Sequence, residues 1–486
     1  MYSDIVIIGA GVVGCGLARE LSRYNASVRV LEAGYDVAES SSRANSGIVH
    51  AGYDCVPGTN KAKFNVEGAK MYPKLVEELG VPYKHWGAMI IGFDESDKKT
   101  LEKLLQQGIE NGVEQLEIID GKKALELEPN LNPEVTWALH VPTSAIVSPY
   151  EMNYALADNA VENGVDIVLE TKVSSLYNDG ELWQIRTDNG DFSAKCVINC
   201  AGLFSANIHN QISDVKYKII PRKGEYFMLD RMHPLPFKHT IFQTPGKMGK
   251  GVLVSPTVHG NTFLGPSSND VEDFYDTTTD PEVLDFVFEK SKRTWPGANK
   301  RNVVTTFSGL RAHEENGDFV IGRVSGAKNA YEALGIESPG LSAMPAIAKY
   351  LSNMLAEDMN LSQKKGWIKP TKRRKYFIDM TEEERQAVIA ENNDYAQMVC
   401  RCEQVTEAEI REAIRRPMGA RTVDGIKRRI RAGAGRCQGG FCSPRVIQIL
   451  AEELHISQLD VCKFSKKSKF FVGKVSDFAI KEDSHE

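Results

Sequence analysis

The sequence lacks both long apolar runs and a strong charge of either sign. No stretch of about 18 apolar residues occurs, so a transmembrane helix is not expected. The first residues, MYSDIVIIGAG, lack the basic segment and cleavage site of a secretory signal. A net charge of -6 gives no general attraction to nucleic acid or to anionic membranes. We therefore expect a cytoplasmic protein that neither binds nucleic acid nor inserts into a membrane.

Motifs of several enzyme classes are also missing. The sequence has no nucleophile elbow, HExxH zinc pattern or P-loop, so hydrolase and NTPase functions have no support. Its nine cysteines, in a chain without a secretory signal, favour a reducing compartment. With 486 residues the chain is too long for one ordinary core, and we expect two or three domains.

The N-terminus carries an ordered series of strand, glycine turn and helix signals. Ile5–Ile8 form an apolar run typical of a buried parallel strand, and Gly9, Gly11 and Gly14 follow with GxGxxG spacing. These glycines permit a tight turn and the close approach of a pyrophosphate to a helix N-terminus. The next apolar run, SVRVLE, ends at Glu32, where a carboxylate can accept hydrogen bonds from a ribose. The segment therefore predicts a dinucleotide site.

Further motifs narrow the type of dinucleotide. The stretches NSGIVHAGYDCVPGTNKAKF, CVINCAGLFSANI, TTFSGLRAHEENGDFVIGR and GIESPGLSAMPAIAKYL follow in this order. Over roughly residues 1–360 the chain resembles the FAD-dependent oxidoreductases of the D-amino-acid-oxidase type, which include glycerol-3-phosphate dehydrogenases and L-2-hydroxyglutarate oxidases. The resemblance implies FAD as cofactor, with these contacts: Gly9, Gly11, Val13, Gly14, Glu32, Ala33, Ser42, Asn45, Ser46, Gly47, Val173, Ala201, Gly202, Gly309, Gly340, Leu341 and Ser342.

The fold predicted from these motifs is α/β. The segments YKHWGAMIIGF, VKYKIIPRKGEYFMLD and GVLVSPTVHGNTFLGP are rich in aromatic and β-branched residues, which favours an antiparallel sheet over the flavin. We expect a Rossmann-like FAD-binding domain with an inserted antiparallel-sheet substrate domain, and a small helical C-terminal domain. The predicted ranges are 1–85, 145–215 and 300–362 for FAD binding, 86–144 and 216–299 for substrate, 363–398 for a linker, 399–455 for the C-terminal domain and 456–486 for a tail.

Oxidation of an alcohol by a flavin enzyme needs a base for the hydroxyl proton and a fixed cation for an anionic substrate. Arg311 is the predicted anchor, because a guanidinium pairs with carboxylate or phosphate and the family has a substrate-binding arginine here; a surface ion pair is the alternative. His50 is a candidate base, with a packed histidine as the alternative, and His259 is the second candidate. Lys223 and Tyr226 are predicted substrate contacts, although Tyr226 also fits a core aromatic.

The substrate stays open between two small anions that each carry a secondary hydroxyl. A flavoprotein joined to a terminal cysteine module resembles the large subunits of anaerobic glycerol-3-phosphate dehydrogenases. That group generally has a phosphate-binding arginine where this chain has Asp54, and NSGIVHAGYD is closer to L-2-hydroxyglutarate oxidases. Oxidation of an amine or opine is an alternative with the same hydride chemistry. An electron-relay subunit without a substrate of its own is the alternative of a different class.

Two cysteine pairs stand near the C-terminus, Cys400 with Cys402 and Cys437 with Cys442. Zinc sites usually have longer spacings than CxC, and a CxxC redox motif is absent, whereas four thiolates suit a [2Fe-2S] cluster. Over roughly residues 399–452 the segment resembles the bacterioferritin-associated-ferredoxin-like [2Fe-2S] domain, which implies that the four cysteines are ligands. Four arginines would offset the cluster charge or help to dock an acidic partner: Arg401, Arg431, Arg436 and Arg445.

The C-terminal domain has three predicted short helices. VTEAEIREAIRR opens with a capping box, Thr406 to Glu409, and TVDGIKRRIRAG and SPRVIQILAEEL provide the second and third helices. The whole sequence predicts an FAD-dependent dehydrogenase that passes electrons through a [2Fe-2S] cluster to a partner subunit or carrier. A hetero-oligomer is compatible with this function, and any membrane association is expected to come through the partner.

Overall fold

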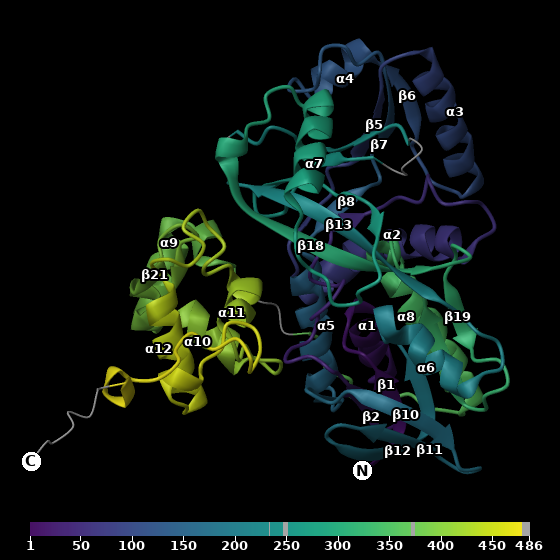
Figure 1. Cartoon of the computed structure of the whole chain (residues 1–486), viewed down its shortest axis with the longest axis vertical. Coiled ribbons are helices and arrows are strands. Elements are labelled where there is room, and N and C mark those ends of the chain that lie inside the picture. Colours follow the sequence, from purple (N-terminus) through teal and green to yellow (C-terminus); the bar gives the residue numbers. More distant parts are fainter. Residues whose placement is uncertain (233, 246–250, 371–374, 479–486) are drawn as a thin grey trace, which may run out of the picture. The chain divides into compact units, whose positions relative to one another are not determined.

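The computed structural model describes residues 1–232, 234–245, 251–370 and 375–478, and the chain divides into two compact units, Met1–Arg373 and Arg374–Glu486 (Figure 1). Parts of the predicted substrate domain, linker and tail lie outside the described residues: 233, 246–250, 371–374 and 479–486. Each unit has buried hydrophobic clusters of its own. In the described part of the chain, no helix combines the length and the apolarity needed to cross a membrane.

The first unit contains an eight-stranded sheet that begins with the N-terminal strand. Its parallel strands are β1 (Tyr2–Ile8), β2 (Val28–Leu31), β9 (Asp166–Val168), β12 (Gly190–Asn199) and β20 (Ala330–Leu334). Three antiparallel strands extend it: β10 (Val173–Asn178), β11 (Trp183–Thr187) and β19 (Val320–Arg323). Ile5, Val6 and Ile7 are 0% exposed, as a strand covered on both faces requires. The predicted Rossmann-like sheet is confirmed.

Four helices pack together beside this sheet. They are α1 (Val12–Leu21), α2 (Asn60–Leu79), α5 (Pro149–Glu162) and α8 (Gly340–Asp358), and α1 contacts both α5 and α8. The short helix α6 (Ser205–Ile212) follows β12 and contacts β10, β12 and β20. Figure 1 shows the eight-stranded sheet at one end of the unit, with α1 and α5 between it and the second sheet.

The second sheet has nine strands. They are β5 (Ala88–Gly92), β6 (Glu117–Asp120), β7 (Trp137–Val141), β13 (Ile219–Leu229), β14 (Thr240–Gln243), β15 (Leu253–Pro256), β16 (Thr262–Gly265), β17 (Asn269–Asp270) and β18 (Val303–Glu314). The predicted antiparallel sheet is confirmed, with one exception, because β5 and β14 pair in parallel. The predicted domain ranges put residues 303–314 with the FAD-binding segments, whereas β18 pairs along its length with β13.

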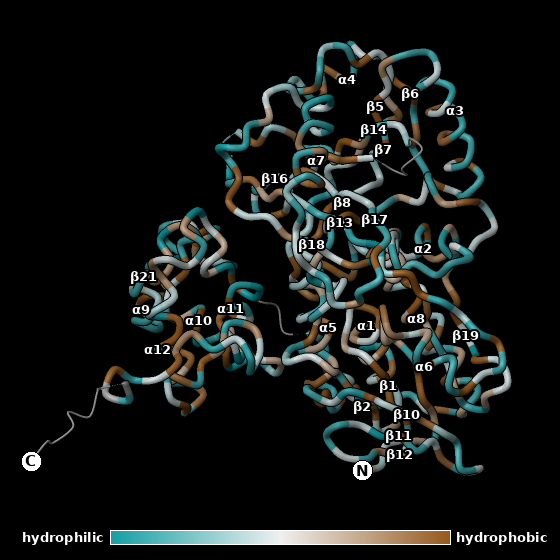
Figure 2. The backbone as a smooth tube through the Cα atoms, in the orientation of Figure 1, coloured by the Kyte–Doolittle hydropathy of each residue, from teal (hydrophilic) through white to brown (hydrophobic). Residues whose placement is uncertain are grey.

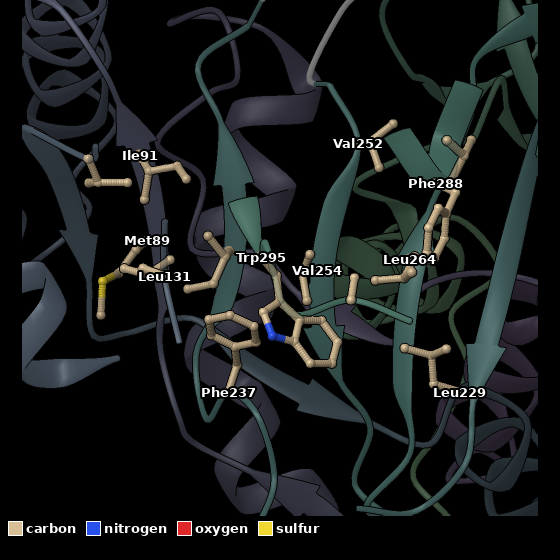
Figure 3. Close-up of a cluster of buried hydrophobic side chains, with 14 of the residues drawn as sticks. Met89, Ile91, Leu131, Leu229, Phe237, Val252, Val254, Leu264, Phe288 and Trp295 are labelled. Carbon is tan, nitrogen blue, oxygen red and sulfur yellow. The ribbon is translucent and has the colours of Figure 1, made fainter. Parts of the chain in front are cut away.

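A hydrophobic cluster stiffens the second sheet where helix α7 (Pro281–Thr294) covers it (Figure 3). Val254 and Leu264 are fully buried, and Phe288 projects onto them from α7. The rings of Phe237 and Trp295 meet edge to face with their centroids 5.7 Å apart. The remaining helices of this part are α3 (Glu95–Glu110) and α4 (Gly121–Leu127), and Figure 2 shows largely hydrophilic residues on the outer helix α3.

The second unit is small and helical. Its elements are α9 (Glu382–Glu391), β21 (Met398–Cys400), β22 (Val405–Thr406), α10 (Glu407–Arg415), α11 (Val423–Ile430) and α12 (Ser443–Leu454). The Thr406 side chain accepts from the Glu409 N–H, and the Glu409 side chain accepts from the Thr406 N–H, so the predicted capping box is confirmed. All three predicted helices are present. Ile410, Ile426 and Leu450 form their common core and are 0% exposed.

Candidate active site

A large cavity opens inside the first unit and is lined by residues of both sheets. Its volume is about 1370 Å³, above the roughly 300–1,000 Å³ of an ordinary small-molecule site, which gives room for a dinucleotide and a small substrate together. Of the predicted cofactor contacts, fifteen line it: Gly9, Gly11, Val13, Glu32, Ala33, Ser42, Asn45, Ser46, Gly47, Val173, Ala201, Gly202, Gly309, Gly340 and Leu341. Gly14 and Ser342, the other two, are not among the lining residues.

The glycine turn between β1 and α1 leaves no room for side chains. Gly9 has a φ of 102°, and a Cβ there would lie 2.5 Å from the Cys200 carbonyl oxygen. A Cβ at Gly14 would lie 2.0 Å from the Gly9 carbonyl oxygen. Helix α1 begins directly after Gly11, and the Val12 N–H donates to Ser42 Oγ at 2.9 Å. The exposed backbone and the positive end of α1 fit a pyrophosphate.

Glu32 stands at the end of β2, where the sequence places a ribose-binding carboxylate. Its Oε2 accepts from the Ala10 N–H and its Oε1 from the Gly34 N–H, both at 2.7 Å. Burial raises the pKa of Glu32, and the two backbone N–H groups partly offset that rise. The carboxyl group is thus fixed beside the glycine turn in the lining of the cavity, a position that fits the binding of a ribose.

Most of the segment of residues 40–47 lines the cavity, and this segment contacts β18 of the second sheet. Its Ala44 carbonyl oxygen packs against β18 so closely that a Cβ at Gly309 would lie 2.0 Å away. Asn45 holds the turn, because its Oδ1 accepts from the Gly47 N–H at 2.9 Å. Ser46 Oγ and Tyr226 Oη lie 3.3 Å apart. The backbone of this segment is therefore presented to the cavity along a fixed path, which fits contact with a flavin.

His50 follows the short strand β3 (Ile48–Val49), which pairs with β8 (Ala145–Val147), itself paired with β4 (Tyr83–Lys84). The side chain of His50 lines the cavity and is 8% exposed. Its backbone N–H donates to Ser342 Oγ at 2.7 Å, and Ser342 Oγ donates to the Ile48 carbonyl at 3.3 Å. Ser342 thus joins the first turn of α8 to β3 and fixes the position of His50.

His259, the second candidate base, does not line the cavity. Its Nε2 lies 2.7 Å from Oε1 of Glu151, a buried carboxylate in the first turn of α5. The structure brings His50, Arg311 and Tyr226 to the cavity and leaves His259 outside it. Of the two histidines, only His50 lies where a bound substrate is expected among the described residues.

The two strands β13 and β18 supply one wall of the cavity. Arg222 and Tyr226 of β13 and Arg311 of β18 all line it. Side chains alternate along a strand, so Lys223 faces the opposite way. Lys223 Nζ lies 2.7 Å from Asp276 Oδ2 and 3.7 Å from Glu225 Oε1, outside the lining. The sequence interpretation named Lys223 and missed Arg222, although Arg222 shares the two-residue period of Tyr226.

The four C-terminal cysteines form two pairs. The sulfurs of Cys402 and Cys437 lie 3.9 Å apart, and the Cys442 thiol donates to Cys400 and lowers the pKa of Cys400. The Phe441 N–H lowers the pKa of Cys437. In the described part of the chain, no three His, Cys, Asp or Glu side chains gather around one point as a single metal ion requires. Two thiol pairs instead suit two irons with two thiolates each.

Two of the four arginines that were predicted to offset the cluster charge form ion pairs with glutamates. Arg431 Nε lies 2.7 Å from Glu403 Oε2, and both side chains are buried. Arg445 Nη2 lies 2.6 Å from Glu407 Oε2. Arg401 and Arg436 are exposed beside the exposed Cys402 and the partly buried Cys437. These two arginines are thus the exposed members of the predicted set of four that are adjacent in sequence to a cysteine.

Comparison with known proteins covers both units of the chain. Residues 4–354 match the family described as FAD dependent oxidoreductase. The chain belongs to this family. Residues 398–452 match the BFD-like [2Fe-2S] binding domain. The predicted cofactors, FAD and [2Fe-2S], are thereby confirmed, and the zinc alternative is set aside.

Similar proteins share either the whole chain or its first unit. A glycerol 3-phosphate dehydrogenase of Caloramator mitchellensis is 44% identical over 97% of this chain and 98% of its own length. An L-2-hydroxyglutarate dehydrogenase of Arabidopsis thaliana is 26% identical over 72% of this chain and 83% of its own length. The solved L-alpha-glycerophosphate oxidase of Mycoplasma pneumoniae with FAD bound superposes with a TM-score of 0.72, at 30% identity over 76% of this chain and 97% of that protein. The predicted oxidoreductase class is confirmed.

Proposed function

We propose that this FAD-dependent oxidoreductase oxidises the secondary hydroxyl of glycerol 3-phosphate and passes the electrons through its cysteine domain to a partner protein. The observation that carries the proposal is the relative named glycerol 3-phosphate dehydrogenase, which is 44% identical over 97% of the chain and so spans both units. Asp54 lines the cavity where glycerol-3-phosphate dehydrogenases of this type generally have a phosphate-binding arginine, which counts against a phosphate substrate, and in this proposal Arg311 of the same lining supplies the cation instead. FAD, when bound, accepts a hydride from the carbinol carbon.

In this proposal a ring nitrogen of His50 takes the proton of the substrate hydroxyl. The support is positional: His50 lines the cavity, and Ser342 fixes its backbone at 2.7 Å. A base must lie within hydrogen-bond reach of the proton that it removes, and His259 is instead paired with Glu151 outside the lining. Arg311 anchors the anionic end of the substrate through its guanidinium.

The acceptor in this proposal is a protein and not oxygen. A relative named glycerol 3-phosphate oxidase, from Mycoplasma pneumoniae, matches 75% of this chain and 97% of its own length, whereas the dehydrogenase relative matches 97% of the chain. The difference corresponds in length to the cysteine domain, whose cluster, when bound, transfers electrons one at a time. None of the nine cysteines, all of them among the described residues, forms a disulfide, which supports a reducing, cytoplasmic compartment as part of the proposal.

The test is anaerobic titration of the purified holoprotein with glycerol 3-phosphate and, separately, with L-2-hydroxyglutarate. Loss of the visible flavin absorbance at stoichiometric glycerol 3-phosphate is the expected result. Reduction by L-2-hydroxyglutarate alone would replace the substrate and keep the reaction class. If neither compound reduces the flavin, the dehydrogenase proposal fails, and the relay alternative gains its support.

Arg311→Ala separates an enzyme from a relay subunit. Loss of a charged hydrogen-bonding partner should weaken the binding of an anionic substrate by about 10-fold to 100-fold. A relay has no substrate for Arg311 to hold, so its flavin should be reduced by dithionite and re-oxidised by an added acceptor at the unchanged rate in both proteins. A raised KM together with unchanged dithionite reduction supports the enzyme.

A further inference from the structure

Facing residues on β13 and β18 form three matched pairs where the two strands line the cavity. Arg222 lies opposite Arg311, Gly224 opposite Gly309 and Tyr226 opposite Phe307. The two rings of the last pair stack, with centroids 4.7 Å apart and planes 3° from parallel. Like charges placed directly opposite each other destabilise an antiparallel pair, so the arginine pair has a structural cost. Negative charge near the pair is needed to offset this cost, from a neighbouring carboxylate, from a ligand in the cavity, or from both.

Arg222 is held in place by a carboxylate on the neighbouring strand. Asp270 of β17 faces Arg222 in the strand register. Oδ1 of Asp270 lies 2.6 Å from Nε of Arg222, and Oδ2 lies 3.3 Å from Nη2. This two-point contact uses one edge of the guanidinium and leaves Nη1 for another acceptor. Arg222 is therefore both oriented and able to bind at the cavity.

Arg311 lies in the space that the glycine pair leaves open. A Cβ at Gly224 would lie 2.5 Å from Nη2 of Arg311, so the guanidinium folds over this glycine. Its one hydrogen bond to protein is a long one, from Nη2 to the Ser267 carbonyl at 3.4 Å. Among the described residues, no carboxylate lies within ion-pair distance of Arg311. Its charge is thus available to a ligand.

We propose that Arg222 and Arg311 form a two-armed site for the phosphate of a phosphate monoester, with Arg222 as the second cation. The inference rests on the proposed function and adds the residue that makes the site selective for phosphate. One guanidinium can satisfy both oxygens of a carboxylate, whereas a phosphate monoester has three terminal oxygens and takes a second donor. Asp270 is a positioning residue, and Gly224 supplies the space for Arg311.

The decisive variant is Arg222→Gln in the FAD-loaded full chain. KM for glycerol 3-phosphate should rise by about 10-fold to 100-fold, because a hydrogen bond between charged groups is lost, while kcat changes little. The Kd of inorganic phosphate, measured by calorimetry without turnover, should rise by a similar factor. The matched control is Arg323→Gln, because Arg323 makes the same two-point contact to Asp358, at 2.7 and 2.6 Å, outside the cavity lining.

A second variant, Gly224→Ala, tests the placement of Arg311 without removing a charge. The new methyl group meets the mobile end of the Arg311 side chain, with Pro266 Cβ 2.9 Å away as the other neighbour. KM and the phosphate Kd should rise, and the urea midpoint, measured alongside, reports separately any loss of stability from the contact with Pro266. Unchanged values in both variants would overturn the two-armed site.

The results for the wild type and for Arg222→Gln together distinguish failure of the phosphate site from failure of the proposed reaction. If the wild-type flavin is not reduced by glycerol 3-phosphate, but phosphate binding weakens in Arg222→Gln, the reaction is wrong and the phosphate site stands. If the wild type is reduced, but KM and the phosphate Kd are both unchanged in Arg222→Gln, then Arg222 has only its ion pair with Asp270. In that case the dehydrogenase stands and the inference falls.

Discussion

The two units hold their reactive groups at very different depths. In the first unit, His50 is 8% exposed inside a cavity of about 1370 Å³. In the second, Cys402 is exposed, and Phe441, one residue before Cys442, is 90% exposed. An enclosed site excludes water and strengthens the electrostatic contacts that orient a substrate. An exposed loop suits contact with another protein, so in the proposed function the difference separates oxidation of the substrate from delivery of its electrons.

Glycine residues serve different purposes at the two sites. In the first unit, glycines allow one backbone to touch another, as Gly9 does at Cys200 and Gly309 at Ala44. In the second unit Gly440 is exposed and Gly439 is buried, and the N–H groups of both hydrogen-bond to Cys437. The first arrangement closes a cavity, and the second prepares a thiolate for metal binding at the surface.

Gly14→Ala should break the enclosed site while leaving the exposed one intact. The added Cβ would lie 2.0 Å from the Gly9 carbonyl oxygen, a backbone atom that cannot move away cheaply. We expect the bound flavin to fall by about tenfold or more, with the iron content per chain unchanged. Flavin and iron analysis of the purified protein measures both values.

The control for this variant is Gly112→Ala. Gly112 has a φ of 80° and nothing within 4 Å of its added Cβ, so the change strains the backbone by about 1 kcal/mol without a collision. It should retain the flavin. If Gly14→Ala also retains a full complement of flavin, the glycine turn is not the pyrophosphate site.

Cys437→Ser should disrupt the exposed cysteine site and leave the flavin site intact. It should therefore separate reduction of the flavin from electron transfer to an acceptor. Serine is a poor ligand for iron, so the cluster should be lost and electron transfer to an added one-electron acceptor should fall to background. Reduction of the flavin by substrate, followed anaerobically, should stay within about twofold of the wild type, since the cavity belongs wholly to the first unit. Stopped-flow spectra and iron content measure the two effects.

The control for Cys437→Ser is Cys462→Ser. Cys462 is buried in the same unit, where its Sγ donates to the Asp460 carbonyl at 3.3 Å, away from the two pairs. Iron content and acceptor reduction should survive this substitution. Equal loss in the two variants would mean that Cys437 acts through the stability of the unit and not as a ligand.

Local signals made much of both sites predictable. The glycine turn, Glu32 and the capping box at Thr406 depend on neighbours a few residues away, and the structure contains each of them. The cysteine spacing was informative for the same reason. Where one short segment fixes the geometry, the sequence and the structure agree.

Features that depend on contacts between distant segments of the chain could not be predicted from the sequence. Lys223 and Arg222 are adjacent, and only the pairing of β13 with β18 shows which of them faces the cavity. His50 and His259 looked alike in sequence, because Glu151, which pairs with His259, lies 108 residues away. The parallel pairing of β5 with β14 also joins segments far apart in the chain. Such choices depend on register and packing, which no short motif carries.

Asp276→Asn should have the smallest effect and tests whether Lys223 belongs to the structure or to the substrate site. The Lys223 ammonium lowers the pKa of Asp276 from 3.8 to about 2, so the pair stabilises the fold at neutral pH. Because the folded-state pKa is depressed, this stability is fully present above about pH 4 and is lost as the pH falls toward 2. The variant should unfold about 1 kcal/mol or less more easily at pH 7, since Asp276 is 26% exposed and Glu225 stays near Lys223. The difference in urea midpoint between the wild type and the variant should disappear at low pH, and KM should be unchanged at every pH. A raised KM would instead place Lys223 in the substrate site and contradict the assignment of one face of β13 to the cavity and the other to the structure.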